Sequence, residues 1–141
     1  MQKLDSNTQQ KIDDTHWYNG DHVSHNTILI VEDDDIIGQL LIDLILLETP
    51  YNAILVNDGK EALEVALKIK PCLCITDYRL PSMNGFELYD RLHATKDMKN
   101  IPAIIMSASL PEEEVASRHL IGLHKPFDLD DLLYRVEQLL H

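Results

Sequence analysis

The 141-residue sequence has few of the residues that mark several classes of protein. Its two cysteines, Cys72 and Cys74, lie two positions apart, which excludes a secreted disulfide framework and fits a reducing compartment. No run reaches the roughly 18 apolar residues that a membrane helix needs. Lys and Arg number 12 against 24 Asp and Glu, and this net charge of −12 argues against nucleic acid or anionic lipid as partners. We therefore expect a cytoplasmic protein with no nucleic-acid and no membrane partner.

The length and the apolar fraction of 45% predict one globular domain. Residues 1–26 stand apart because they are polar throughout and keep no period of 2 or 3.6. They predict a flexible or loosely docked N-terminal arm. Residues 27–141 are expected to form the domain.

Short apolar runs alternate with stretches of helical spacing across this domain. Strands are expected at 27–31, 51–56, 72–76, 101–106 and 119–124. Helices are expected at 36–47, 59–69, 86–93, just after Pro111 and at 129–140. Strands that alternate with helices through short links predict a doubly wound, flavodoxin-like α/β fold with a five-stranded parallel sheet of order 2-1-3-4-5.

Acidic residues follow two strands that this order makes neighbours. Glu32, Asp33 and Asp34 come after the first strand, and Asp77 ends the third. Carboxylates crowded into one pocket raise each other's pKa unless a cation joins them. Mg²⁺ suits such a small, partly hydrated site with oxygen ligands.

A hydroxyl and an ammonium group end the remaining strands. Ser107 ends the fourth strand and Lys125 the fifth, where Pro126 follows. Metal binding alone explains neither residue, whereas both would bind the oxygens of a phosphoryl group. Asp77 would then be the nucleophile and would form an acyl phosphate.

Four runs carry a resemblance to a known family: ILIVEDDD at 28–35, CITDYRLPSMNG at 74–85, IIMSAS at 104–109 and HKPF at 124–127. The sequence resembles the receiver domain of two-component response regulators over 27–141. The resemblance makes Asp77 the phosphoacceptor and assigns Asp34 to the turn after the acid pair. It implies an Mg²⁺ site formed by Glu32, Asp33, Asp77 and the backbone carbonyl of Arg79.

The resemblance also implies how the switch works. Ser107 and its small neighbour Ala108 would form the switch pair, Lys125 would bind the phosphoryl group, and the bond before Pro126 would be cis. The donor would be a histidine kinase or a phosphotransfer protein. We expect a stand-alone, phosphorylation-activated switch that signals by contact with a downstream protein. Whether the chain also forms a homodimer stays open.

The sequence departs from the family after Ser107. Only 18 positions separate Ser107 from Lys125, fewer than the family usually has, which predicts a shortened fourth helix. Gly122 stands three residues before Lys125, where the family usually has a switch aromatic. We therefore expect the readout of phosphorylation to differ from the usual coupling.

Two other functions stay open at this point. One is a receiver-fold interaction module that works without phosphorylation, which the unusual fourth helix favours and the complete acid pocket opposes. The other is an aspartate-nucleophile phosphohydrolase, but such enzymes usually have a second acid two residues after the nucleophile, where this sequence has Arg79. We favour a switch that modifies itself over an enzyme with turnover.

Overall fold

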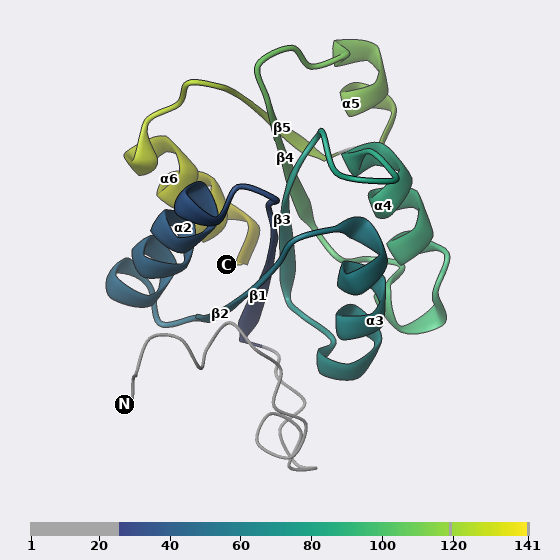
Figure 1. Cartoon of the computed structure of the whole chain (residues 1–141), viewed down its shortest axis with the longest axis horizontal. Coiled ribbons are helices and arrows are strands. Elements are labelled where there is room, and N and C mark those ends of the chain that lie inside the picture. The colour runs from purple at the N-terminus through teal and green to yellow at the C-terminus, as the bar shows by residue number, and fades with distance from the viewer. Residues whose placement is uncertain (1–25, 119, 141) are drawn as a thin grey trace.

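The computed structural model in Figure 1 describes residues 26–118 and 120–140. The predicted arm therefore lies outside the described residues except for Asn26. No helix in the described part of the chain is long and apolar enough to cross a membrane.

A five-stranded parallel sheet forms the centre of the molecule, in the order β2-β1-β3-β4-β5, as predicted. Its strands are β1 (Thr27–Val31), β2 (Asn52–Val56), β3 (Leu73–Asp77), β4 (Ala103–Ser107) and β5 (Ile121–His124). All residues of β1, β3 and β4 are buried. Their continuous apolar, β-branched runs are typical of parallel strands covered on both faces.

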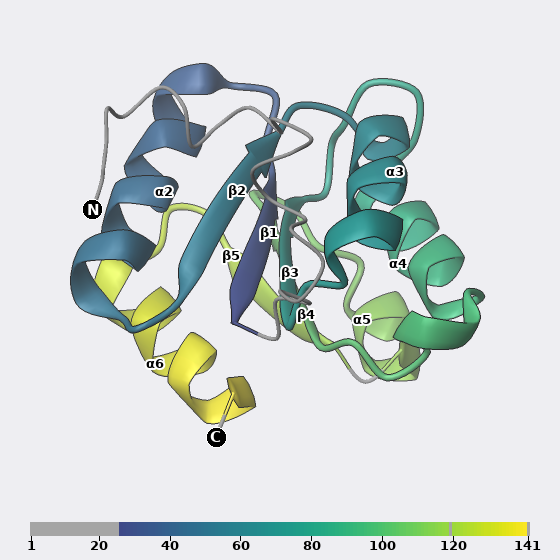
Figure 2. The same ribbon diagram turned by 90° about the horizontal axis from the view of Figure 1, so that it is seen from below.

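Helices cover both faces of the sheet (Figure 2). On one face lie α2 (Asp35–Glu48) and α6 (Leu129–Leu140), and on the other α3 (Gly59–Ile69), α4 (Gly85–His93) and α5 (Glu112–Arg118). A short 3₁₀ helix, η2 (Lys96–Met98), precedes β4. Alternate strand residues point to opposite faces. Accordingly, Ile28 and Ile30 join the core under α2 and α6, while Leu29 and Val31 join the core under α3 and α4.

Side-chain caps start the helices that follow β1, β2 and β3. Asp34 accepts hydrogen bonds from the N–H groups of Ile36 and Ile37, and Asp58 accepts one from Glu61. Asn84 and Glu87 form a reciprocal capping box at α4. Such caps satisfy N–H groups that have no partner within the helix. Each cap fixes where its helix begins after the preceding strand, and the parallel order brings the carboxyl ends of the strands together at one edge of the sheet.

The element bounds differ from the sequence prediction mainly at strand ends. β3 and β4 each extend one residue further, because Asp77 pairs with Met106 and Ser107 pairs with His124 in the parallel ladder. β5 begins at Ile121 rather than at 119. Helix α5 is the fourth helix of the sequence prediction. It has seven residues, so the predicted shortening of this helix is confirmed.

Candidate functional site

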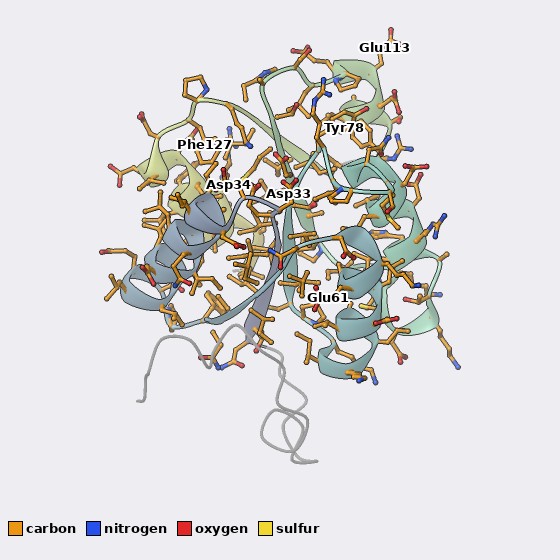
Figure 3. All side chains as sticks on the ribbon, viewed as in Figure 1. Asp33, Asp34, Glu61, Tyr78, Glu113 and Phe127 are labelled. Atoms are coloured by element: carbon orange, nitrogen blue, oxygen red, sulfur yellow. The ribbon has the colours of Figure 1, made fainter. Side chains whose placement is uncertain are left out.

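The acids predicted at the strand ends lie together at the carboxyl edge of the sheet. One carboxylate oxygen from each of Glu32, Asp33 and Asp77 lies within 4.8 Å of the other two. Glu32 is 2% exposed and Asp77 8%, whereas Asp33 is exposed. Figure 3 shows Asp33 at this edge, beside the N-terminal end of α2. The adjacency of β1 and β3 brings these groups together although 44 residues separate Asp33 from Asp77.

Lys125 places a cation among these acids. Its Nζ lies 2.7 Å from Asp77 Oδ1 and 3.9 Å from Glu32 Oε1. The Lys125 N–H donates to the Ser107 carbonyl at 2.8 Å, which continues the β4–β5 ladder beyond the end of β5. The Lys125–Pro126 peptide bond is cis. One ammonium group therefore pairs with two of the three clustered carboxylates, and the pocket keeps an excess of negative charge.

Glu32 is the most constrained of the three acids. Its Oε2 accepts a hydrogen bond from the Asp34 N–H at 3.1 Å, while its Oε1 is buried without a hydrogen-bond partner among the described residues. Burial is the main reason why the pKa of Glu32 is raised above its ordinary value of 4.5, with the nearby charges of Asp77 and Asp33 adding to it. The Asp34 hydrogen bond and Lys125 act in the opposite direction. A buried carboxylate oxygen without a hydrogen-bond partner, in an all-oxygen donor set, fits a hard divalent cation.

Asp34 belongs to the helix rather than to the acid cluster. Its Oδ1 accepts from the N–H groups of Ile36 and Ile37 at 2.9 and 3.1 Å. Asn57, which the sequence analysis overlooked, supports the same turn. Its Nδ2 donates to the Glu32 carbonyl at 3.1 Å and to Asp35 Oδ1 at 3.2 Å. Its position directly after β2 is the signal that could have identified it, because polar residues at that edge face the pocket.

Ser107 and Ala108 lie at the end of β4, on the same edge. Ser107 is 6% exposed, and its Oγ accepts a hydrogen bond from the Ser109 N–H at 3.1 Å. Among the described residues, no hydrogen bond joins this hydroxyl to the acids or to Lys125. Ala108 is exposed. The hydroxyl is thus engaged with its own loop.

The loop after Asp77 is tightly folded against the strand. The Gly85 N–H donates to the Tyr78 carbonyl at 2.8 Å, and Arg79 forms an isolated bridge with Asn84. A Cβ at Gly85 would lie 3.0 Å from the Asp77 carbonyl oxygen, so a side chain there would displace the loop. Arg79 is exposed and forms no ion pair with any described residue. Its carbonyl as a metal ligand stays a prediction.

Gly122, at the position of the absent aromatic, is covered by the loop and helix that follow β4. A Cβ there would lie 2.9 Å from Leu110 Cδ1 and 3.4 Å from the methyl groups of Val115. The space that an aromatic ring would need is therefore occupied by two aliphatic side chains.

Comparison with known proteins agrees with this geometry. Residues 28–137 match the sequence profile of the response regulator receiver domain. The chain belongs to this family. Receiver domains are phosphorylation-based signalling switches of two-component systems.

Individual relatives cover the same region. The chain is 33% identical over 117 residues to the transcriptional regulatory protein RprY of Bacteroides fragilis. The aligned region covers 80% of this chain and 48% of that protein. It is 34% identical over 116 residues to the two-component response regulator ORR3 of Oryza sativa. This aligned region covers 77% of this chain and 88% of that protein. The chain thus spans about half of RprY and most of ORR3.

Solved structures show the same fold. The chemotaxis response regulator CheY4 of Vibrio cholerae superposes with a TM-score of 0.74 at 26% identity, over 82% of this chain and 99% of that one.

Proposed function

We propose that this receiver domain accepts a phosphoryl group on Asp77 from a histidine kinase or a phosphotransfer protein. One observation carries the proposal: Asp77, nearly buried, lies 2.7 Å from Lys125 Nζ and next to two further acids. A carboxylate is the nucleophile that forms an acyl phosphate, and the neighbouring ammonium group offsets the negative charge that would otherwise repel the incoming phosphoryl group.

The transfer needs little from the protein beyond positioning and charge. A carboxylate oxygen of Asp77 forms a bond to phosphorus while the bond from phosphorus to the donor's imidazole nitrogen breaks, and its electron pair stays on that nitrogen. The product is an acyl phosphate. Lys125, already in contact with both Asp77 and Glu32, would then bind a phosphoryl oxygen.

A divalent cation, most simply Mg²⁺, fits the acid cluster. We assign its ligands to Asp33, Asp77 and the Arg79 carbonyl, with Glu32 acting through a water molecule. When bound, the cation neutralises phosphoryl oxygens and offsets the repulsion among the three acids. The buried Glu32 Oε1, which has no hydrogen-bond partner among the described residues, supports this assignment.

Ser107 would complete the switch. Its hydroxyl now accepts from the Ser109 N–H, and it could instead donate a hydrogen bond to a phosphoryl oxygen. Such a change moves the loop after β4 and reports phosphorylation to a downstream protein. On this proposal the phosphorylated state itself is the signal, so the chain acts as a switch rather than as a turnover enzyme.

A protein donor must contact the carboxyl edge to deliver its phosphoryl group to Asp77. Ile36 is 83% exposed, and it lies one residue into α2, three positions after Asp33. Leu40 is 50% exposed one turn further along the helix. Exposed apolar side chains beside a functional site mark contact surfaces for proteins. We assign the start of α2 to the donor, so Ile36→Asp should slow transfer from a phosphorylated donor protein but not from acetyl phosphate.

The test is to incubate the protein with Mg²⁺ and acetyl phosphate and to record its intact mass. The proposal expects a single phosphoryl adduct on the wild type and none on Asp77→Asn. Asp34→Asn is the matched control, because it removes a neighbouring charge outside the cluster and keeps a capping residue, so it should still form the adduct. An adduct on Asp77→Asn, or none on the wild type with either acetyl phosphate or a phosphorylated donor protein, would contradict the proposal.

A further inference from the structure

The parallel ladder between β1 and β2 ends at Glu32, beside the acid cluster. Val31 and Val56 are its last residue pair, and beyond them the Glu32 N–H donates to the Val56 carbonyl at 3.0 Å. If the ladder continued, the Glu32 carbonyl would accept its next hydrogen bond from the N–H of Asp58. Asp58 is instead the N-cap of α3, where the chain turns away from the ladder. The Glu32 carbonyl therefore needs a donor from elsewhere.

The side chain of Asn57 supplies that donor. Its Nδ2 donates to the Glu32 carbonyl at 3.1 Å and to Asp35 Oδ1 at 3.2 Å. One amide nitrogen thus joins the end of β1 to the first residue of α2. Both partners only accept hydrogen bonds, so this place requires a side chain with two N–H donors. A carboxylate of the same shape at position 57 would face two acceptors without a hydrogen to share.

The turn at 32–35 is held at three points. They are the ladder bond to Val56, the bond from the Asp34 N–H to Glu32 Oε2 and the Asn57 amide. This turn carries Glu32 and Asp33, two of the three clustered acids. Like charges in the cluster push these carboxylates apart, so their backbone must be held for them to stay close together. Asn57 is the side chain from β2 that holds it.

We propose that Asn57 is a positioning residue of the acid cluster, which sets the affinity of the site for a divalent cation by holding the turn that carries Glu32 and Asp33. The inference rests on the proposed metal site. Among the described residues, no hydrogen bond or ion pair joins Asn57 to Asp77 or Lys125, so Asn57 has no part in the transfer itself. Hydrogen-bond partners that orient metal ligands typically account for a factor of about 10 to 100 in metal affinity.

Binding of Mn²⁺ tests the inference without any phosphoryl donor. Mn²⁺ prefers oxygen ligands as Mg²⁺ does, and the electron paramagnetic resonance signal of the free ion reports binding directly. The wild type should bind one ion per chain, and Asn57→Ala should bind one ion about tenfold more weakly. Asn52→Ala is the matched control, because Asn52 is exposed at the opposite end of the same strand, and it should bind like the wild type. A variant that had only lost its fold would show fewer sites per chain rather than one weaker site.

Asn57→Asp separates positioning from charge. An added carboxylate beside the cluster attracts a cation, so charge alone predicts tighter binding of Mn²⁺. Asp at this position cannot donate to the Glu32 carbonyl and repels Asp35, so loss of positioning predicts weaker binding. An exposed charge is screened by solvent, and we therefore expect binding about tenfold weaker than in the wild type. Binding as tight as in the wild type, or tighter, would overturn the inference.

The Mg²⁺ dependence of adduct formation with acetyl phosphate gives a second readout. In Asn57→Ala the half-saturating Mg²⁺ concentration should rise about tenfold. The rate at saturating Mg²⁺ should stay within about twofold of the wild type, because the contact of Lys125 with Asp77 at 2.7 Å does not involve Asn57. A lower saturated rate with an unchanged half-saturating concentration would contradict the inference, since it would place Asn57 in the transfer step.

The inference and the proposed function can fail separately. A wild type that binds Mn²⁺ and forms the adduct, with Asn57→Ala equal to it in both measurements, overturns the inference and leaves the proposed function standing. A wild type that binds no Mn²⁺ overturns the metal assignment and the inference with it.

Discussion

Replacing Glu32 by Gln should stabilise the metal-free protein and weaken its response to Mg²⁺. At an effective dielectric constant of about 20, the ammonium of Lys125 attracts Glu32 by about 4 kcal/mol at 3.9 Å, and each like charge, which lies within 4.8 Å, repels it by about 3 kcal/mol or more. Two repulsions outweigh one attraction, and burial adds a further penalty for the ionised form. Because Asp33 is exposed and screened by solvent, we expect a net gain of about 1 to 2 kcal/mol for Glu32→Gln.

The assay is thermal or urea unfolding at pH 7 with a chelator, beside Glu64→Gln as the control for an exposed acid. The variant should melt about 4 °C higher per kcal/mol gained, and the control should melt with the wild type. Added Mg²⁺ should stabilise the wild type more than the Glu32 variant, since binding to the native state raises stability by mass action.

The pH dependence has a definite sign. Because the pKa of Glu32 is raised in the folded protein, the unfolded chain binds fewer protons near that pKa, and the wild type regains stability as the pH falls. The advantage of Glu32→Gln should therefore be largest above the raised pKa and shrink as the pH falls to 4.5. A variant that melts below the wild type at pH 7 without metal would refute the claim that this carboxylate is unfavourable in the empty pocket.

Substitutions at three other positions have expected outcomes. Ser82 has a φ of 74°, in the left-handed region, so Ser82→Gly should raise the free energy of unfolding by about 1 kcal/mol in urea titrations, and a decrease would contradict the strain argument. Asp34→Ala removes two capping hydrogen bonds from α2 and should lower that free energy by about 1 kcal/mol, while Asp34→Asn should change it little. Lys125→Met removes the cation at 2.7 Å from Asp77 and should slow formation of the acetyl phosphate adduct about a hundredfold, with rates near wild type counting against its role.

The fold follows from local patterns that are visible in the sequence. Each strand is a short apolar run, each helix has a periodic apolar face, and short connections allow few topologies. The sheet order and the short α5 were therefore predictable. Strand ends were less so, because the extension of β3 to Asp77 depends on its pairing with Met106 across the sheet.

The candidate site was predictable where residues follow strands. Glu32, Asp33, Asp77 and Lys125 each end or follow a strand, and the strand order brings them to one edge. The sequence alone could not show which of the three consecutive acids 33–35 joins the cluster and which caps the helix. The capping hydrogen bonds show that Asp34 caps α2. The functional roles of these residues remain predictions for the experiments above.

The ion pair that joins α5 to α4, between Arg118 and Asp90, could not have been predicted from the sequence. Asp90 and Arg118 are 28 residues apart, on different helices, and neither stands in a motif. Gly122 signalled only that an aromatic side chain was absent. That Leu110 and Val115 fill its place depends on how α5 crosses β5, which is a property of the three-dimensional packing.

The central claim is that Asp77 carries the phosphoryl group, and the most direct measurement locates the modified residue. The protein is treated with a phosphoryl donor and Mg²⁺ and then with borohydride, which reduces an aspartyl phosphate to homoserine, and tandem mass spectrometry identifies the position. The account predicts homoserine at 77 only, in a yield that falls when Mg²⁺ is chelated. Homoserine at another acid, or none in a protein shown to bind Mg²⁺, would contradict it.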